Sequence, residues 1–133
     1  MPSSIRTPIL SGAGGLPKFL LAAPDGARAE IYLQGAHVTS WIPAGGVEQL
    51  FLSRTAFFAP GDPIRGGVPV CWPQFSGEGP LQAHGFARNV AWQMVGVQAN
   101  SDGSATATLR LSDSAATRAF WPHAFAAEIT STV

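Results

Sequence analysis

Apolar and polar residues alternate without a break through residues 105–112. A period of two puts every second side chain on the same face, which indicates a β-strand with one buried face. Turn signals such as Pro24-Asp25-Gly26, in which Pro sets φ and Gly permits positive φ, separate this strand pattern from others. The sequence therefore predicts an all-β fold. The expected strands lie near residues 18–23, 28–33, 36–42, 90–99, 104–112 and 124–133, with one helical turn between residues 113 and 120.

Composition supports this fold and excludes several classes of function. The 15 glycines and 11 prolines are spread along all 133 residues, which indicates many turns between short elements. Only 12% of residues are charged, the formal net charge is zero and Lys18 is the one lysine. Nucleic-acid binding needs clustered Lys and Arg, so we expect no nucleic-acid partner.

Localisation is predicted from what the sequence lacks. No run of about 18 apolar residues is present that could cross a membrane. Residues 1–10 do not have the charged start and apolar core of a secretory signal. The single cysteine, Cys71, cannot form an internal disulfide. Together these features favour the cytoplasm.

The length suits one domain of ordinary size. Residues 1–17, rich in Ser, Gly and Pro, are expected to form a flexible N-terminal arm, and residues 18–133 to form the β domain. The last predicted strand runs to Val133 with no closing turn, so an edge or face of its sheet is expected to stay uncovered. Because uncovered apolar faces seek partners, we expect a homodimer that covers the open sheet.

Between residues 53 and 88 the strand pattern gives way to interleaved Pro, Gly, Phe and Arg with no period. So long an irregular stretch in a compact domain usually indicates function or disorder. Aromatic side chains argue against disorder here, because they are expected to pack against the rest of the protein. They are Phe51, Phe57, Phe58, Trp72, Phe75 and Phe86.

The densest cluster of notable residues is 64–75, with the sequence IRGGVPVCWPQF. Two glycines after Arg65 allow close backbone packing beside its guanidinium, which is a good fork for a phosphate or a carboxylate. The simpler interpretation is an arginine in a turn with a surface ion pair, and composition alone favours that interpretation.

The second cluster is His84-Gly85-Phe86-Ala87-Arg88. Histidine is the usual acid or base near neutral pH, the glycine after it allows a ligand to come near, and Arg88 adds a second cation. A lone histidine before a glycine is more often structural. However, the two clusters flank one irregular segment, and two arginines, a histidine and aromatic rings suit a phosphorylated sugar.

Other candidates are weaker. His37 lies in a strand pattern and is expected to be structural, His123 is ambiguous, and Cys71 is expected to be a buried small apolar residue. No His or Cys residues have the spacing of metal ligands, so we expect no metal. The chain also lacks a phosphate-binding loop ending in Lys-Ser/Thr and a Gly-x-Ser-x-Gly hydrolase motif.

Residues 64–69 (IRGGVP), 72–75 (WPQF) and 84–89 (HGFARN), in this order and spacing and followed by Trp92, resemble the hexose-6-phosphate mutarotases. These enzymes, also called glucose-6-phosphate 1-epimerases, belong to the aldose 1-epimerase superfamily. Weaker matches lie on both sides of these motifs, and the resemblance covers roughly residues 29–133. The weaker matches are Gly35-Ala36-His37 with Trp41, residues 50–53 and residues 121–125.

This resemblance implies about half of an antiparallel β-sandwich of the galactose-mutarotase, or supersandwich, type. It implies an enzyme that interconverts the α and β anomers of a hexose 6-phosphate without a cofactor. A base removes the proton of the anomeric hydroxyl, an acid protonates the ring oxygen, and the ring opens and closes again. Carried over by motif, Arg65 and Arg88 bind the phosphate, and His84 hydrogen-bonds the sugar and assists catalysis.

Two departures from the family pattern matter. Some members have a substrate-contacting Gln directly before the motif histidine, where this chain has Ala83. Gln82 is one step earlier, and a shift of one residue on a strand turns the side chain to the other face. The family's principal catalytic histidine and acidic residue lie beyond the position of Val133, so the chain as given is expected to be incomplete or inactive. Asp62 and Glu78 are the acidic residues nearest to the motifs in sequence.

Two other functions remain open at this point. The chain could be a non-catalytic module that binds sugar phosphates or other carbohydrates through Arg65, His84 and Arg88. Alternatively, it could be a half-sandwich that acts only after self-association.

Overall fold

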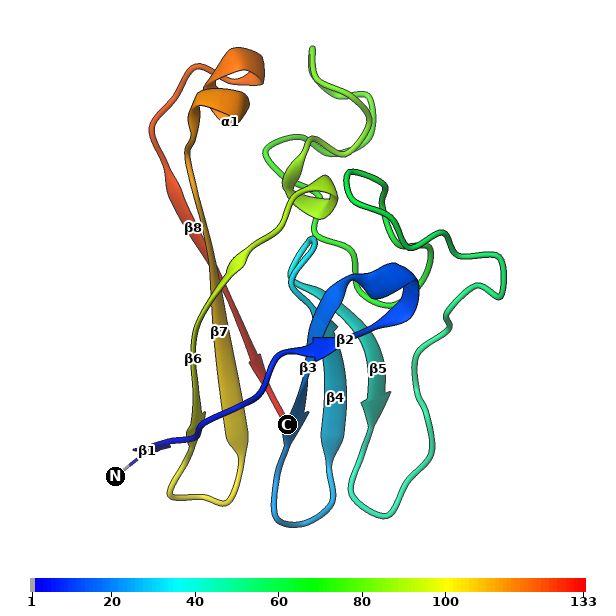
Figure 1. Ribbon diagram of the computed structural model, residues 1–133, viewed down its shortest axis with the longest axis vertical. Coiled ribbons are helices and arrows are strands. Elements are labelled where there is room, and N and C mark those ends of the chain that lie inside the picture. Colours follow the sequence, from blue (N-terminus) through cyan, green and yellow to red (C-terminus); the bar gives the residue numbers. More distant parts are fainter. Residues whose placement is uncertain (1) are drawn as a thin grey trace.

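The computed structural model describes residues 2–133 and contains two four-stranded antiparallel sheets that face each other (Figure 1). The strand orders are β1-β6-β7-β8 and β2-β3-β4-β5. The prediction of an all-β, antiparallel sandwich is confirmed. The strands are β1 (Ser3–Ser4), β2 (Leu10–Ser11), β3 (Pro17–Ala22), β4 (Arg28–Tyr32), β5 (His37–Ile42), β6 (Gln93–Ala99), β7 (Ala105–Ser112) and β8 (Ala126–Thr132). Helix α1 (Ala115–Phe120) joins β7 to β8, and short 3₁₀ turns η1 (Ala13–Gly15) and η2 (Ala87–Asn89) complete the structure.

All six strands predicted from the sequence are present, and the largest boundary error is at β6, which begins at Gln93 instead of residue 90. The predicted helical turn is α1. It begins at a capping box, in which Ser114 Oγ accepts from the Thr117 N–H and Thr117 Oγ1 accepts from the Ser114 N–H. Strands β1 and β2 were not predicted, because two residues are too few to show a period. They pair with β6 and β3, so residues 3–11 add one edge strand to each sheet.

The apolar core lies between the two sheets and follows from the alternation in the sequence. In β7, Ala107 and Leu109 are fully buried, whereas Arg110 is exposed. Phe19 and Leu21 of β3 are fully buried on the facing sheet, and β3 packs against β7. Burying a Leu or Phe side chain contributes about 1.5–3 kcal/mol, so this core is the main source of stability.

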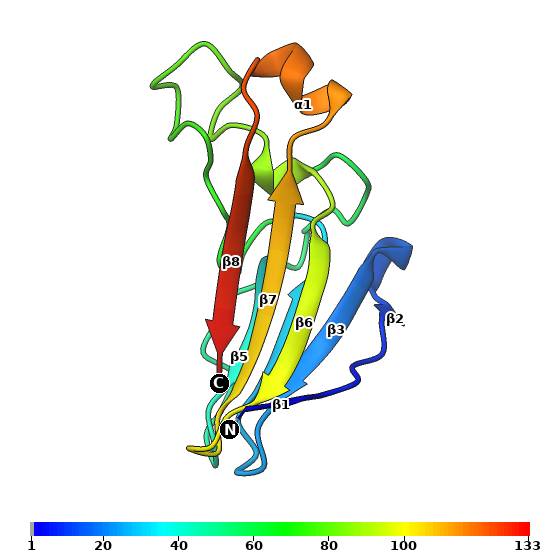
Figure 2. The same cartoon turned by 90° about the vertical axis from the view of Figure 1, so that its left-hand side faces the viewer.

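The irregular segment, residues 53–88, lies at the same end of the sandwich as α1, in both views (Figures 1 and 2). The turns that join β3 to β4 and β6 to β7 lie at the opposite end. Both motifs are therefore presented at one end of the sandwich. None of the helices in residues 2–133 has the length and the hydropathy that a membrane crossing requires.

The packing of the irregular segment differs from what its aromatic content predicted. Trp72 does pack, with its ring centroid 4.7 Å from that of Phe125. However, Phe51, Phe57 and Phe75 are 77%, 66% and 66% exposed, so the expectation that they pack against the protein is wrong. The reason is that this stretch is held mainly through its backbone, which leaves several rings on the outside. Cys71 was expected to be buried, and it is only half-buried.

Candidate functional site

Arg65 lies in a backbone segment that passes between the segment of Phe51 and strand β5. On one side the Gly67 N–H donates to the carbonyl of Phe51 (2.7 Å), and on the other the Val68 N–H donates to the carbonyl of Val38 in β5 (2.9 Å). The segment is thus fixed to both neighbours by backbone hydrogen bonds. The side chain of Arg65 itself is exposed.

Two glycines make this close passage possible. Gly66 and Gly67 have φ values of +122° and +61°, and a Cβ on them would lie 2.5 Å from the Phe51 oxygen and 2.2 Å from the Val38 oxygen. A side chain cannot be accommodated at those separations, so only glycine fits. The glycine pair therefore reflects tight packing of backbone on backbone, a cause different from the approach to a guanidinium that the sequence suggested.

His37, the first residue of β5, is fully buried and contacts this segment. Its Nε2 lies 2.5 Å from the Gly66 carbonyl oxygen, and because a carbonyl only accepts, Nε2 carries the proton and donates. Burial lowers the pKa of His37, the nearby Arg88 guanidinium lowers it further, and the bond to Gly66 opposes this shift. The net direction is downward, so the ring is neutral at pH 7 with Nδ1 unprotonated.

Arg88 lies in η2. Its backbone packs on Gly35, where an added Cβ would lie 2.9 Å from the Arg88 carbonyl oxygen. Its side chain is half-buried, and Nη2 donates to the carbonyl of Ala83 at 3.3 Å. The guanidinium acts on the pKa of His37, which also contacts Gly66. One buried ring therefore neighbours both the segment of Arg65 and the side chain of Arg88.

His84 has an unusual backbone conformation, and both its backbone and its ring are hydrogen-bonded. Its φ is +67°, and its Nδ1 accepts a hydrogen bond from the Ser76 N–H at 3.0 Å. An accepting Nδ1 places the ring proton on Nε2, which is then a donor for another group. The ring is half-buried and meets Phe75 edge-on, with 5.2 Å between centroids. The glycine after it, Gly85, is required by backbone packing, because a Cβ there would lie 2.3 Å from the Trp72 oxygen.

Buried polar atoms without a hydrogen-bond partner gather at this site. Among the residues that the structure describes, three such side-chain atoms occur: Nδ1 of His37, Nε of Arg88 and Oδ1 of Asn89. Buried polar atoms are satisfied in the great majority of cases, and exceptions often mark functional positions. All three belong to residues in or beside the two motifs. The acidic residues nearest in sequence, Asp62 and Glu78, are exposed.

A buried glutamine that sequence reasoning missed organises the loop between the motifs. The Nε2 of Gln74 donates to three carbonyls of residues 76–82, and its Oε1 accepts from the Leu81 N–H at 2.9 Å. The only signal in the sequence is a Gln between Pro and Phe, which does not show these long-range contacts. A second glutamine, Gln34, does the same for the preceding loop and donates to the carbonyls of Ala59 (2.9 Å) and Asp62 (2.5 Å).

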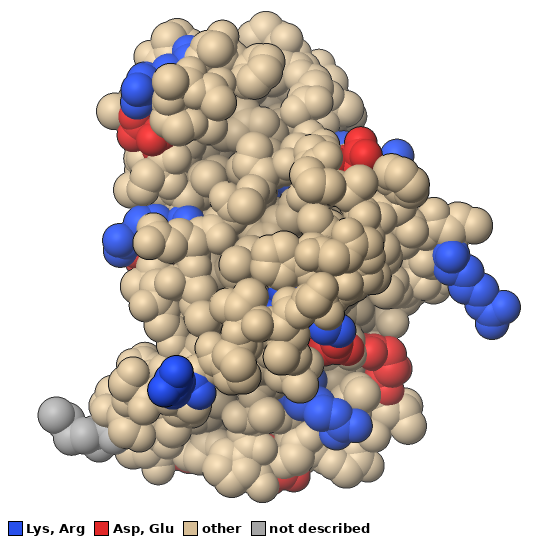
Figure 3. Space-filling model, in the orientation of Figure 1, with Lys and Arg blue, Asp and Glu red and all other residues tan. Residues whose placement is uncertain are grey.

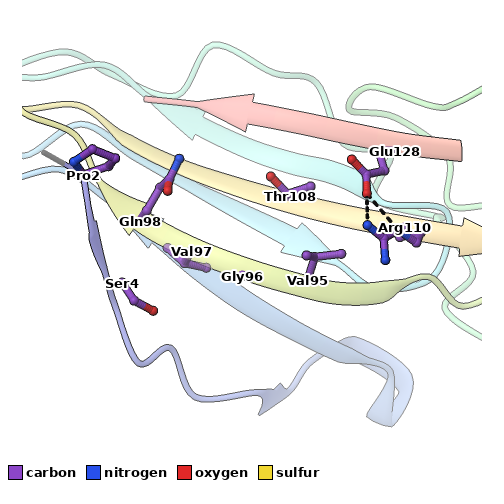
Figure 4. Close-up of a pocket in the computed structure, with 9 residues that line it drawn as sticks. All are labelled: Pro2, Ser4, Val95, Gly96, Val97, Gln98, Thr108, Arg110 and Glu128. Carbon is purple, nitrogen blue, oxygen red and sulfur yellow. Dashed lines mark hydrogen bonds and ion pairs between the residues drawn. The ribbon is translucent and has the colours of Figure 1, made fainter.

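Charge elsewhere on the surface is sparse. On the face in Figure 3, charged side chains are scattered and most of the surface is uncharged. A groove on the β1-β6-β7-β8 sheet contains Arg110, but its Nε already donates to Glu128 at 2.7 Å (Figure 4). That guanidinium is therefore engaged by a carboxylate, and the groove does not suit an anion. Within residues 2–133, no three His, Cys, Asp or Glu side chains are grouped so that they could hold a metal.

The fold and site define the class of protein: a two-sheet antiparallel β-sandwich with arginine and histidine motifs on one irregular segment. Comparison with known sequences then gives the family. The profile described as "Aldose 1-epimerase" matches residues 17–133, and the chain belongs to this family.

Several relatives carry a more specific description. A "Putative glucose-6-phosphate 1-epimerase" of Escherichia coli K12 is 49% identical over 100 residues, which are 74% of this chain and 34% of the relative. A protein of the same description from Cenchrus ciliaris is 41% identical over 125 residues, 91% of this chain and 36% of the relative. The chain thus spans about a third of the length of these curated relatives.

Solved structures give the same fold. The crystal structure of "a putative mutarotase" from Salmonella typhimurium superposes with a TM-score of 0.77 at 36% identity and covers 90% of this chain. This chain covers 44% of that structure, less than half of its length.

Proposed function

We propose that this chain forms the phosphate-binding part of a hexose-6-phosphate mutarotase, which interconverts the α and β anomers of a hexose 6-phosphate. Family membership and the description of the relatives support this function. The observation that carries the proposal is the hydrogen bond from the buried His37 ring to the carbonyl of Gly66, the residue after Arg65. The Arg88 guanidinium acts on the same ring and lowers its pKa. Arg65 and Arg88 then supply one anion site, and charge-assisted bonds from two guanidinium groups hold the phosphate.

His84 is the residue of this chain that we assign to the sugar. Its Nδ1 is engaged by the Ser76 N–H, so its Nε2–H is available to donate to a sugar oxygen. Opening the sugar ring needs a base at the anomeric hydroxyl and an acid at the ring oxygen, each of which typically contributes 10²–10⁴-fold. His84 assists this chemistry, but Asp62 and Glu78 are exposed and neither is matched by motif. We therefore expect the chain alone to bind a hexose phosphate and to accelerate anomer exchange only slightly.

Titration calorimetry with glucose 6-phosphate and with glucose tests the anion site. Arg65→Ala and Arg88→Ala should each weaken binding of glucose 6-phosphate about tenfold or more, because each removes a charge-assisted hydrogen bond. Binding of glucose should barely change. Arg6→Ala is the matched control, since Arg6 is an exposed arginine outside the motifs and its loss changes the net charge equally. Equal losses in Arg6→Ala and Arg88→Ala would refute a specific phosphate site.

A half-sandwich that acts after self-association is the second candidate, and the edge of β8 favours it. Among residues 2–133, β8 pairs only with β7. Ala105 and Val133 exchange both of their backbone hydrogen bonds, so the alternation of antiparallel pairing directs the backbone groups of Glu128 and Thr130 to the open edge. Open edges of this kind pair with other strands. We expect a dimer in analytical ultracentrifugation at micromolar concentration, and a uniform monomer would refute this candidate.

A further inference from the structure

We infer that His37 is a positioning residue for the phosphate site, because its ring fixes the Gly66–Gly67 peptide, which lies next to Arg65, by donating from Nε2 to the Gly66 carbonyl. The inference rests on the proposed function, in which Arg65 binds the phosphate. It assigns to His37 a role beyond that of a buried strand residue.

The Gly66–Gly67 peptide is held from both sides. Its N–H donates to the Phe51 carbonyl at 2.7 Å, and its C=O accepts from His37 Nε2 at 2.5 Å. Both glycines have positive φ and no side chain, so their backbone has wide freedom when unrestrained. The orientation of this peptide therefore depends on these two hydrogen bonds. The adjacent Arg65 is held on its other side, where its carbonyl accepts from the Ser53 N–H at 3.0 Å.

The same ring is suited to a place beside Arg88. A neutral imidazole with its proton on Nε2 has one donor, and His37 commits that donor to Gly66. Because the ring is neutral, His37 places no second positive charge next to the guanidinium of Arg88. Burial of the ring keeps it in this neutral form and so maintains both the arginine environment and the loop contact.

Two substitutions separate the donor from the bulk of the ring. In His37→Gln the side-chain amide nitrogen lies about where Nε2 lies in histidine, so it can still donate to Gly66. In His37→Asn the side chain is shorter and its amide nitrogen lies about where Nδ1 lies, so it does not reach Gly66. In calorimetry at pH 7.5, His37→Asn should bind glucose 6-phosphate about fivefold more weakly than the wild type, which corresponds to one neutral hydrogen bond. His37→Gln should bind within about twofold of the wild type. The affinity of the two variants for glucose 6-phosphate could instead fall in step with their melting temperatures, whether or not the side chain can donate to Gly66. In that case His37 is only structural and the inference is overturned.

Nuclear magnetic resonance of the wild type tests the same contact without ligand. Nitrogen-15 spectra should show the His37 ring with a proton on Nε2 and a bare Nδ1, and a proton on Nδ1 alone would overturn the inference. Amide exchange of Gly67 should be faster in His37→Asn and near normal in His37→Gln. If the wild type does not bind glucose 6-phosphate, the proposed function fails. The exchange data then decide the positioning role, and unchanged exchange in His37→Asn would overturn it.

Discussion

The β-sandwich and the irregular segment of residues 53–88 differ in what holds their backbone. Each strand pairs with its neighbours in a ladder, with one register shift between β4 and β5 and one between β6 and β7. The two sheets are joined by buried apolar side chains such as Phe19 and Leu109. The irregular segment makes only isolated bridges, among them Leu52 with Gly66 and Trp72 with Gly85. The scaffold thus relies on paired strands and apolar burial, whereas the motifs combine individual hydrogen bonds with a few apolar anchors, since Phe86 and Ala87 belong to the same buried core.

Three buried polar side chains add to the backbone hydrogen bonds of the irregular segment. Gln34, His37 and Gln74 are each at most 9% exposed, and each donates to backbone carbonyls of the irregular segment. Apolar burial is not directional, whereas a hydrogen bond sets the angle of the peptide that it holds. The comparison teaches that apolar burial between the sheets supplies most of the stability, and that these three side chains help to set the path of the backbone at the candidate site.

The largest expected effect is in the sandwich. Leu109→Ala should lower the free energy of unfolding by about 2–5 kcal/mol, because it leaves a cavity between the sheets. Leu20→Ala is the control, since Leu20 is 49% exposed on β3 and should cost about 0.5 kcal/mol or less. Urea unfolding followed by circular dichroism gives both values. Similar losses for the two variants would contradict a core between the sheets.

A smaller effect is expected in the irregular segment. Gln74→Leu keeps a buried side chain but removes the donor for the carbonyls of residues 76–82, which should cost about 1–3 kcal/mol. Amide exchange should accelerate at Leu81, whose N–H loses its acceptor, and stay unchanged in β7. Gln98→Leu on exposed β6 is the control. Faster exchange throughout β7 would show that the two regions are not separable in this way.

The smallest effect is a dependence of stability on pH through His37. Because the folded-state pKa of His37 is lowered below its ordinary value of 6.5, the unfolded chain binds more protons below that pH. Its contribution to stability is therefore complete above about pH 6.5 and is lost as the pH falls towards the folded-state pKa. Unfolding midpoints in urea at pH 7.5 and 5.5 should differ more in the wild type than in His37→Gln. An equal difference in both proteins would argue against a neutral His37.

The sandwich could be predicted from the sequence because its signal is local. Alternation in residues 105–112 gives both the strand β7 and its buried face. Strands β1 and β2 could not be found in this way, since each has two residues and is defined only by its pairing with another strand. The helical turn before Trp121-Pro122 could be predicted, because a residue before proline avoids the α region.

The site could be predicted only as a set of motifs. Arg65, His84 and Arg88 were identified by residue type and by resemblance, and their joint action on a phosphate stays a prediction. His37 and Gly66 are 29 residues apart in the sequence, and no sequence pattern in either segment predicts their contact. The exposed ring of Phe75 shows the same limit, since aromatic content predicts burial and only the path of the backbone decides it.

The most direct test of the account is anomer exchange in glucose 6-phosphate, measured by saturation transfer with and without the purified chain. Phosphorus-31 spectra of the same samples report binding. We predict that the phosphorus resonance shifts with the wild type and much less with Arg88→Ala at the same concentrations, while exchange stays close to its rate in buffer. Exchange that is strongly accelerated by the wild type and abolished by His84→Ala would contradict the account, because these 133 residues would then form a complete enzyme.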